Sequence, residues 1–344
     1  MMTSMRTIEW KNGIVTTVDQ TKLPNETVLL KMTGCKELAE AIIIMQIRGA
    51  PLLGAAAAYG LALTAYHSKA NDKEQLMEEL MASAKLLKKT RPTAVNLFWA
   101  VGRVMEKAKK AKGNAKTVVK TVVKEARKIA AEDVDMNKKI GEHGSSLIDD
   151  GDTVLTHCNA GSLATVDYGT ALGVIRTAWE KGKNIKVIAT ETRPLLQGAR
   201  LTAYELLRDG IPVTLITDSM VGYIMTKKLV NKVIVGADRI VRDAVVNKIG
   251  TYTIAVLAHK HKIPFYVAAP KSTFDLNRLA KTVIIEERNM EEVVKFAGVQ
   301  IAPKDVPAFN PAFDITPLKY VTAIICEAGV LSPKAFQKLS TARD

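Results

Sequence analysis

The second half of the chain alternates short apolar runs with helical stretches, and this alternation restricts the fold more than any other feature. Strand-like runs lie at 153–156, 186–189, 213–216, 233–235, 265–268 and 321–325, with a weaker one at 282–285. Helical stretches separate most of them, at 162–181, 198–209, 219–228 and 250–261. Apolar strands that alternate with helices predict a doubly wound, mostly parallel Rossmann-like α/β sheet covered on both faces.

The first half has a different pattern. Two short strand-like runs flank Asn12-Gly13, a pair typical of a tight β-hairpin turn. Helical periodicity follows at 34–45, 51–67, 73–89, 93–112 and 116–147. We therefore predict a mainly helical domain with a β-hairpin at residues 1–130 and a Rossmann-like α/β domain at 131–344.

The positive charge of the chain is concentrated in one region. The formal net charge is +14, and the stretch from Lys85 to Lys139 holds 16 Lys and Arg against 5 Asp and Glu. Such a region can attract nucleic acid, an acidic membrane or an anionic substrate, but the favoured interpretation is a solvated helical face. Aromatic residues make up only 5% of the chain, and no single-strand stacking platform is visible among these lysines, which disfavours a nucleic-acid partner.

Two further features narrow the class of protein. The apolar run Ala50–Tyr66 contains Gly and Pro and follows Arg48, which indicates a buried helix and no membrane span. The three cysteines (Cys35, Cys158 and Cys326) lack metal-site spacing, so a reduced, cytoplasmic setting is expected. The sequence contains neither a P-loop nor a glycine fingerprint after its first apolar strand, and it lacks a carboxylate cluster suited to a metal. No cofactor and no metal are predicted.

Polar clusters follow the predicted strands, where ligands bind in parallel sheets. Cys158 lies in Thr156–Ser162, and a following helix N-terminus would favour its thiolate, although a buried structural cysteine is an equal alternative. Asp238 ends another apolar strand, and partial burial would raise its pKa and make it a proton donor. The alternative for Asp238 is a turn cap or a partner of Arg239.

Two more clusters belong to the same half. In Thr190–Gly198, Arg193 and Gln197 can point into one crevice, unless Arg193 pairs with Glu191. Asn247 and Lys248 can bind hydroxyls and phosphate, unless they form an ordinary polar turn.

The helical half contains two candidate anion sites. Pro51 suits the first turn of a helix, so Arg48, Gly49 and Ala50 would lie beside free backbone N–H groups. Arg91 precedes Pro92 and a second predicted helix. Two arginines at helix starts marked by proline favour phosphate over a plain surface charge.

Taken in order, these strings resemble the 5-methylthioribose-1-phosphate isomerase family. The matching strings are I-E-W-K-N-G (8–13), D-Q-T-K-L-P (19–24), R-G-A-P (48–51), T-H-C-N-A-G-S-L-A (156–164), E-T-R-P-x-x-Q-G-A-R (191–200), G-A-D-R-I (236–240) and N-K-I-G-T (247–251). The resemblance extends from about residue 6 to 335. Ribose-1,5-bisphosphate isomerase and the regulatory subunits of the translation-initiation guanine-nucleotide exchange factor share part of the pattern. The regulatory subunits generally lack the Cys–Asp pair.

The resemblance implies an aldose–ketose isomerase that converts 5-methylthioribose 1-phosphate to 5-methylthioribulose 1-phosphate in methionine salvage. It implies that Asp238 and Cys158 are catalytic. The implied substrate-binding residues are Arg48, Gly49, Ala50, Arg91, Gln197, Asn247 and Lys248, in a cleft between the two domains. A homodimer formed through the α/β half is also implied. The alternatives are a ribose-1,5-bisphosphate isomerase and a non-catalytic subunit that senses a sugar phosphate or nucleotide.

Overall fold

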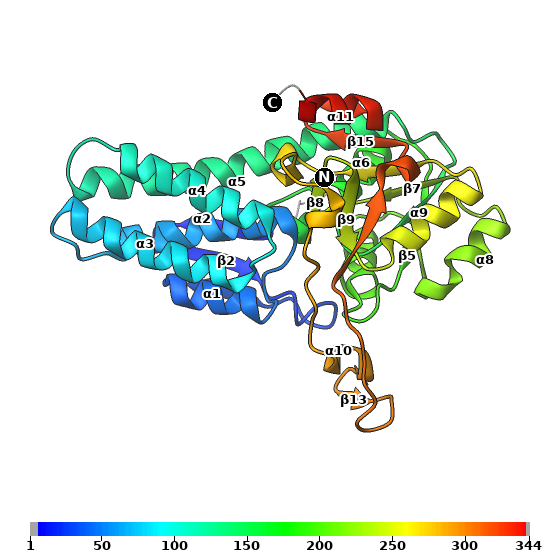
Figure 1. The fold of residues 1–344 in the computed structure, drawn as a ribbon, viewed down its shortest axis with the longest axis horizontal. Helices are drawn as coiled ribbons and strands as arrows, with labels where there is room; N and C mark the ends of the chain where they lie inside the picture. Colours follow the sequence, from blue (N-terminus) through cyan, green and yellow to red (C-terminus); the bar gives the residue numbers. More distant parts are fainter. Residues whose placement is uncertain (1–5, 342–344) are drawn as a thin grey trace. The chain divides into compact units, whose positions relative to one another are not determined.

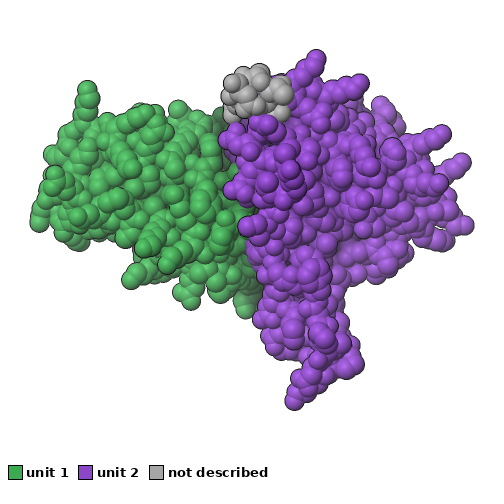
Figure 2. Space-filling view, in the orientation of Figure 1, with its two compact units in different colours: residues 1–138, 161–169 green, residues 139–160, 170–344 purple. Residues whose placement is uncertain are grey.

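The structure is a computed structural model that describes residues 6–341 (Figure 1). The chain forms two compact units, coloured separately in Figure 2. Unit 1 extends to Lys138 and also includes Gly161–Gly169, and unit 2 comprises Lys139–Ala160 and the chain from Thr170 onward. The division falls within one long helix, α5 (Ala115–Ser145), which also contains the boundary predicted after residue 130.

Unit 1 combines a small antiparallel sheet with a helical bundle. The predicted hairpin is present, and Asn12 and Gly13 both have positive φ, as its tight turn requires. A third strand that the sequence did not reveal pairs with the second. The elements are β1 (Ile8–Lys11), β2 (Ile14–Val18), β3 (Leu29–Met32), α1 (Cys35–Ile43), α2 (Ala50–His67), α3 (Lys73–Thr90), α4 (Val95–Lys110) and the first part of α5.

Helix α2 forms the centre of unit 1. It is apolar on all sides, as expected for a helix surrounded by others, and it packs against α1, α3 and α4. The apolar run from Ala50 is therefore a buried helix, as predicted. Among the described residues, no helix is long and apolar enough to cross a bilayer.

Unit 2 is built on a seven-stranded sheet in the order β16-β15-β10-β7-β4-β5-β6. Neighbouring strands are parallel throughout, except that β16, at one edge of the sheet, runs antiparallel to β15. This arrangement confirms the predicted doubly wound, mostly parallel fold. The strands are β4 (Thr153–Thr156), β5 (Lys186–Thr190), β6 (Val213–Ile216), β7 (Lys232–Val235), β10 (Phe265–Ala268), β15 (Ala323–Cys326) and β16 (Gly329–Leu331).

Successive residues of each strand enter two different cores. Val154 packs with α6 (Ala171–Glu180) and α7 (Ala203–Arg208) on one face, whereas Leu155 packs with α8 (Val221–Thr226) and α9 (Thr251–Lys260) on the other. Burial on both faces explains why the sequence shows continuous apolar runs. Helix α11 (Pro333–Thr341) also contributes to the second core through Phe336.

A second, four-stranded sheet was missed by the sequence analysis. Its order is β11-β8-β9-β14, formed by β11 (Phe274–Asp275), β8 (Arg239–Val241), β9 (Ala244–Lys248) and β14 (Phe313–Pro317). The predicted weak strand at 282–285 is wrong, because it lies in irregular chain where Ile284 is 80% exposed. A projecting segment with α10 (Glu291–Val294), β12 (Lys295–Phe296) and β13 (Val299–Gln300) follows (Figure 1).

Candidate functional site

The strand order of the large sheet reverses between β4 and β7. The chain runs outward from β4 through β5 to β6, and then returns to add β7 on the other side of β4. Ligands of open α/β sheets bind outside the carboxyl ends of the strands at such a switch point. Cys158 follows β4 and Asp238 follows β7, so both residues predicted to be catalytic come directly after the two strands that flank the switch point.

The backbone of Cys158 is fixed from both sides. Its N–H donates to Thr192 Oγ1 at 2.9 Å, and its carbonyl accepts from Thr202 Oγ1 at 2.6 Å. Cys158 has a φ of +60°, a conformation that is uncommon for residues other than glycine. Thr192, which holds it, has a φ of +64°. Such strained backbone persists where surrounding contacts impose it, and it is frequent at functional sites.

The helix predicted at 162–181 begins later than expected. A single 3₁₀ turn covers Ser162–Ala164, and α6 begins only at Ala171. The intervening residues bond to unit 1 and are not helical. The prediction that Cys158 lies at a helix N-terminus is therefore wrong, and a helix dipole does not account for any thiolate character.

His157 joins three of the polar clusters. Its Nε2 lies 2.8 Å from the carbonyl oxygen of Ile249, so Nε2 carries the proton and donates. Its Nδ1 lies 2.6 Å from Thr190 Oγ1, and that hydroxyl lies 3.3 Å from Thr192 Oγ1. Burial lowers the pKa of His157, which keeps the imidazole neutral at neutral pH. His157 thereby connects the ends of β4, β5 and β9.

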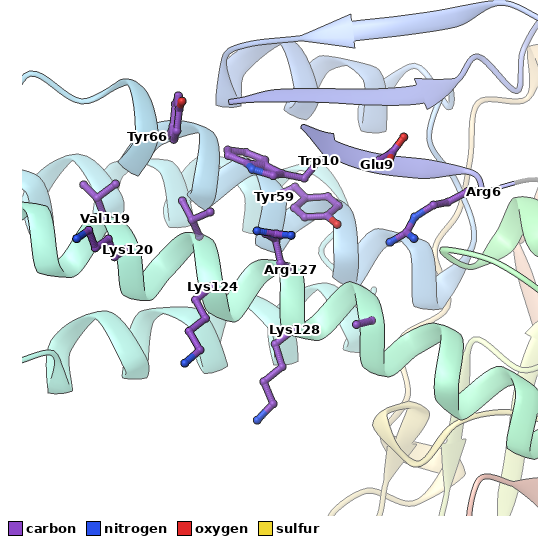
Figure 3. Close-up of a pocket in the computed structure, with 12 residues that line it drawn as sticks. Arg6, Glu9, Trp10, Tyr59, Tyr66, Val119, Lys120, Lys124, Arg127 and Lys128 are labelled. Carbon is purple, nitrogen blue, oxygen red and sulfur yellow. The ribbon is translucent and has the colours of Figure 1, made fainter. Parts of the chain in front are cut away.

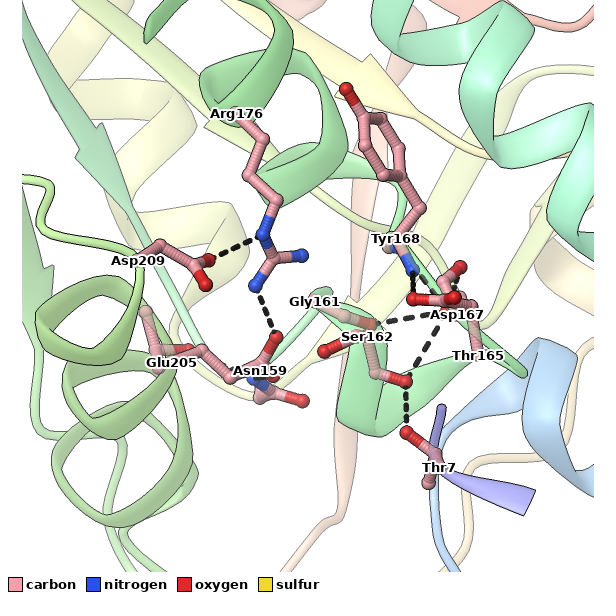
Figure 4. A network of polar contacts seen from close by, with 12 residues as sticks. Thr7, Asn159, Gly161, Ser162, Thr165, Asp167, Tyr168, Arg176, Glu205 and Asp209 are labelled. Carbon is pink, nitrogen blue, oxygen red and sulfur yellow. Dashed lines mark hydrogen bonds and ion pairs between the residues drawn. The ribbon is translucent and has the colours of Figure 1, made fainter. Parts of the chain in front are cut away.

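Asn159 is held by a buried ionic network, drawn in Figure 4. Its Nδ2 donates to Glu205 Oε1 at 2.8 Å, and the other oxygen of Glu205 accepts from Arg176 at 2.7 Å. Arg176 also pairs with Asp209. Burial alone would lower the pKa of Arg176, but the two carboxylates outweigh burial and raise it. The network fixes the residue that follows Cys158.

Asp238 is attached to β9 and lies beside the Cys158 cluster. Its N–H donates to the carbonyl of Val246 at 3.0 Å, and its side chain is half-buried. A Cβ on Gly236 would lie 2.8 Å from the Cβ of Ala160, so the two strand-end segments touch there. Arg239 forms an ion pair with Asp275 at 3.6 Å.

The cluster after β5 depends on a close backbone contact. A Cβ on Gly198 would lie 1.7 Å from the carbonyl oxygen of Thr190, so only glycine fits. The next residues form a π-helical turn, Gly198–Thr202, a feature frequent at functional sites. Gln197 is buried, and its Oε1 has no hydrogen-bond partner among the described residues. An unbonded buried amide oxygen is suited to a ligand hydroxyl.

Arg193 has a structural role in its observed contacts. Its guanidinium donates to the carbonyls of Pro194 and Val293, and it lies 5.7 Å from the ring centre of Phe296. These contacts fasten the projecting segment to the end of β5. The proposed pairing of Arg193 with Glu191 is replaced by this arrangement.

Asn247 and Lys248 are the last residues of β9 and not a polar turn. Both are buried, with Asn247 donating to Thr251 Oγ1 at 3.0 Å and Lys248 Nζ donating to the Ala312 carbonyl at 2.7 Å. Asp314 is the register partner of Asn247 on β14 and accepts from the N–H groups of Gly250 and Tyr252. Burial raises the pKa of Asp314 to about 6.

The candidate residues of unit 1 lie at helix ends. Arg48 is buried, Gly49 caps α2 with a φ of +103°, and Ala50 is the first residue of α2. A Cβ on Gly49 would lie 2.5 Å from the Cα of Ala164, so the helix start presses against segment 161–169. Arg91 is the C-cap residue directly after α3 (Lys73–Thr90) and donates to the sulfur of Met45.

Segment 161–169 belongs to unit 1 and is held there by hydrogen bonds from residues before Lys138. Thr7 donates to the Ser162 carbonyl at 2.6 Å (Figure 4), and Gln20 donates to the Leu163 carbonyl at 2.8 Å. The buried carboxylate of Asp133 accepts from the N–H of Val166 at 2.7 Å and from Asn137 at 3.0 Å. The chain directly after the Cys158 cluster is therefore anchored by β1, the β2–β3 connection and α5.

The fold and the strand-end clusters define a Rossmann-like α/β protein with a candidate ligand site at a topological switch point. The chain belongs to the initiation factor 2 subunit family, whose model matches residues 46–333. It is 56% identical over 329 residues to a putative methylthioribose-1-phosphate isomerase of Archaeoglobus fulgidus, covering 96% of each chain. It is 53% identical to the methylthioribose-1-phosphate isomerase of Thermosipho melanesiensis, covering 95% of each.

Solved structures carry two kinds of name. The 5-methylthioribose 1-phosphate isomerase of Pyrococcus horikoshii OT3 matches with a TM-score of 0.91 and 46% identity, covering 98% of this chain and 96% of that one. A chain from A. fulgidus described as translation initiation factor eIF-2B, subunit delta, matches with a TM-score of 0.87 and 55% identity, covering 97% and 100%. These names do not agree on activity, so the site residues must decide it.

Sequence reasoning missed the residues that support this site. His157, Thr192 and Thr202 position Cys158, yet each reads as an ordinary polar residue beside a strand. The sequence feature that could have pointed to them is the recurrence of threonine near glycine and alanine in the segments that follow the strands. The contacts themselves join residues up to 92 positions apart, which no local pattern reveals.

Proposed function

We propose that this chain is an isomerase that converts 5-methylthioribose 1-phosphate to 5-methylthioribulose 1-phosphate in methionine salvage. The observation that carries the proposal is the placement of Cys158 and Asp238 after β4 and β7, the two strands that flank the switch point. The highly similar relatives named for this reaction support the choice of substrate. The presence of the Cys–Asp pair argues against a non-catalytic subunit.

The reaction interconverts an aldose and a ketose, and its first difficulty is the phosphate. A sugar with phosphate on its anomeric oxygen cannot open its ring by hemiacetal exchange. The bond from C1 to the ring oxygen must break while that oxygen receives a proton. Asp238 would donate this proton, which requires a protonated carboxyl group in a site shielded from water.

Hydrogen must then move from C2 to C1. In one route the thiolate of Cys158 removes the C2 proton to give an enediol-type phosphoenolate, and the proton returns at C1. In the other route hydride passes directly from C2 to C1, and Cys158 helps to exclude water. With deuterium at C2, loss of label to solvent supports proton transfer, whereas full retention supports the hydride shift.

The remaining site residues would bind substrate. Gln197, with its unbonded buried amide oxygen, suits a sugar hydroxyl. Asn247 and Lys248, at the end of β9, offer further donors. Arg48, Gly49, Ala50 and Arg91 are proposed to bind the phosphate, since α2 begins with free N–H groups beside an arginine.

The direct test is a substrate panel. Purified protein is supplied with 5-methylthioribose 1-phosphate or with ribose 1,5-bisphosphate, and formation of the ketose is measured. Rapid turnover of the first substrate alone is expected. Preference for the bisphosphate would assign the chain to the related isomerase, and turnover of neither would favour a sensing subunit.

We also propose a cytoplasmic homodimer formed through unit 2. Cys35, Cys158 and Cys326 are not joined in disulfides in the described structure, which suits a reducing compartment. The sheet ends at β6, and exposed apolar side chains occur on β6 and on the segments just before and after it in the chain; we take these as one patch, made of Leu207, Leu215, Met220, Tyr223 and Leu229. Patches of this kind mark interaction surfaces.

Light scattering after size exclusion tests the dimer. Tyr223→Glu places a charge at a side chain that is 62% exposed and should yield monomers. Phe309→Glu is the matched control, because Phe309 is 75% exposed but lies outside the patch. A wild-type monomer, or equal effects of both substitutions, would contradict this interface.

A further inference from the structure

Unit 1 contains a groove that the proposed reaction does not use. It has a volume of about 690 Å³ and is lined by residues of β1, α2 and α5 together with Arg6 (Figure 3). This volume lies within the range of about 300–1,000 Å³ that small-molecule sites occupy. All lining residues belong to unit 1, so the groove is complete within that unit.

One wall of the groove is aromatic. The Trp10 ring stacks on Tyr59, with centroids 5.9 Å apart and planes inclined by 26°, and Tyr66 meets Trp10 edge-on at 5.7 Å. Tyr59 is buried beneath this pair, whereas Trp10 is half-buried and Tyr66 is 47% exposed. Two rings are therefore available to a ligand, and the third fixes one of them in place.

The opposite wall is cationic. Lys120, Lys124, Arg127 and Lys128 follow one another along α5 at spacings of four, three and one residues, and all four are among the residues that line the groove. Together with Arg6 they place five cations around the groove, against the single carboxylate of Glu9. This excess of positive charge favours an anionic occupant.

The two arginines converge on the aromatic wall. Figure 3 shows Arg127 extending from α5 toward Tyr59, and Arg6 reaching toward the same residue from the start of β1, while Lys124 and Lys128 extend from the outer side of α5. Arg6 bonds to the Tyr59 hydroxyl, and both guanidinium groups oppose the rise that burial imposes on the pKa of Tyr59. A pair of guanidinium groups beside a hydroxyl is a good phosphate site.

The fold places aromatic rings from other parts of the chain beside the basic residues of α5. Within residues 85–139 the aromatic residues are Phe98 and Trp99, both on α4. The α5 part of that stretch has none of its own, but β1 and α2 bring Trp10 and Tyr66 against it. A ring platform beside a guanidinium pair matches a flat base joined to phosphate. Two accessible rings in a bounded groove suit one nucleotide better than a strand, which needs successive stacking positions.

We propose that this groove binds a nucleoside phosphate, with the base on Trp10 and Tyr66 and the phosphate on Arg6 and Arg127. The proposal does not depend on the isomerase reaction, because none of these residues belongs to the strand-end clusters.

Isothermal titration of the full chain with adenosine and guanosine mono- and diphosphates tests the proposal. Binding of at least one nucleotide is expected. Arg127→Gln should weaken it about tenfold, because a charge-assisted hydrogen bond is lost, and Tyr66→Leu should weaken it severalfold. Both side chains lie at the surface, so the variants should remain folded.

A matched control separates a site from general attraction. Lys85→Gln with Lys89→Gln removes exposed charge from α3, outside the groove, and should leave nucleotide affinity unchanged. Equal weakening by this control and by Arg127→Gln would overturn the proposal. Binding of inorganic phosphate as tight as that of nucleotides, or tighter binding of a single-stranded oligonucleotide, would also overturn it. So would binding that survives Arg127→Gln but is lost in Gln197→Ala, or no binding at all.

Discussion

Residues 157–160 and 161–169 are consecutive in the chain, yet they are held by different units. The first segment is fixed by side chains from the end of β5 and from the turn and helix α7 that follow it, which bond to the backbone of Cys158 and to the side chains of His157 and Asn159. The second is fixed through its backbone by Thr7, Gln20 and Asp133 of unit 1. One continuous loop thus carries Cys158 and also the surface against which α2 begins.

This difference indicates two kinds of support. In the first segment, tight contacts impose a strained backbone at Cys158, so small changes should affect the reaction strongly. In the second, the backbone is tied down by hydrogen bonds to a separate core, so changes should affect mainly the stability of unit 1. The following substitutions test this division, beginning with the largest expected effect.

Cys158→Ser should reduce turnover by a factor of about 10²–10⁴, the range for loss of a positioned acid–base group. The hydroxyl is far less acidic than the thiol, while the backbone contacts with Thr192 and Thr202 can persist. Steady-state kinetics with unchanged thermal stability would support a direct role. A loss of only a few-fold would mean that the thiol is structural.

Gly198→Ala should destabilise the protein by about 3 kcal/mol or prevent folding, because the added Cβ would overlap the Thr190 carbonyl. Chemical denaturation measures the free energy of unfolding. Gly102→Ala is the control, since a Cβ there has nothing within 4 Å. A fully stable Gly198→Ala protein would show that the turn after β5 is less constrained than its geometry indicates.

Asp133→Asn should change the pH dependence of stability. Burial raises the folded-state pKa of Asp133 to about 7 from 3.8. The stabilising contribution of the protonated carboxyl is fully present below about pH 4 and is lost as pH rises through 7. Asparagine keeps the acceptor for Val166 but does not titrate. We therefore expect the free energy of unfolding of the wild type to fall by about 2 kcal/mol relative to this variant between pH 4 and 8. This is below the upper limit for the shift, because each pKa unit corresponds to about 1.4 kcal/mol.

Denaturation at several pH values measures this difference, with Asp135→Asn as an exposed control on the same helix. Parallel pH profiles for wild type and Asp133→Asn would contradict the account of how segment 161–169 is anchored.

Thr192→Val should have the smallest effect, about 1 kcal/mol in transition-state stabilisation, or roughly a five- to tenfold lower kcat. The methyl group fills the space of the hydroxyl, but the N–H of Cys158 loses its acceptor. Thr121→Val, which removes an exposed hydroxyl bond within α5, should leave kcat unchanged. Unchanged kcat in Thr192→Val would show that this contact does not position Cys158.

The sequence predicted the parts of this loop that depend on local pattern. The apolar run of β4 and the small polar residues after it marked Cys158, and alternating strands and helices gave the doubly wound sheet. The start of α6 was misplaced, because Ser162–Gly169 reads as amphipathic but bonds to unit 1, a tertiary effect that local propensity does not contain.

Other features were out of reach for similar reasons. Strands β8, β9 and β14 are short, and β14 pairs with β9 across about seventy residues. The groove in unit 1 is lined by Trp10 and Tyr66 on one side and Arg127 on the other, which are far apart in the sequence. Neither the aromatic residues nor the cations would reveal the groove from the sequence alone. The position of polar residues after apolar strands predicted the candidate site, but the residues that hold Cys158 in place emerged only from the contacts.

The central claim is that Asp238 and Cys158 perform an isomerisation at the switch point between β4 and β7. The most direct measurement is turnover and binding of 5-methylthioribose 1-phosphate by Asp238→Asn. Asparagine has nearly the same shape but cannot donate the proton for ring opening, so turnover should vanish while the dissociation constant of the substrate stays within a few-fold of wild type. Near-normal turnover in this variant would contradict the account.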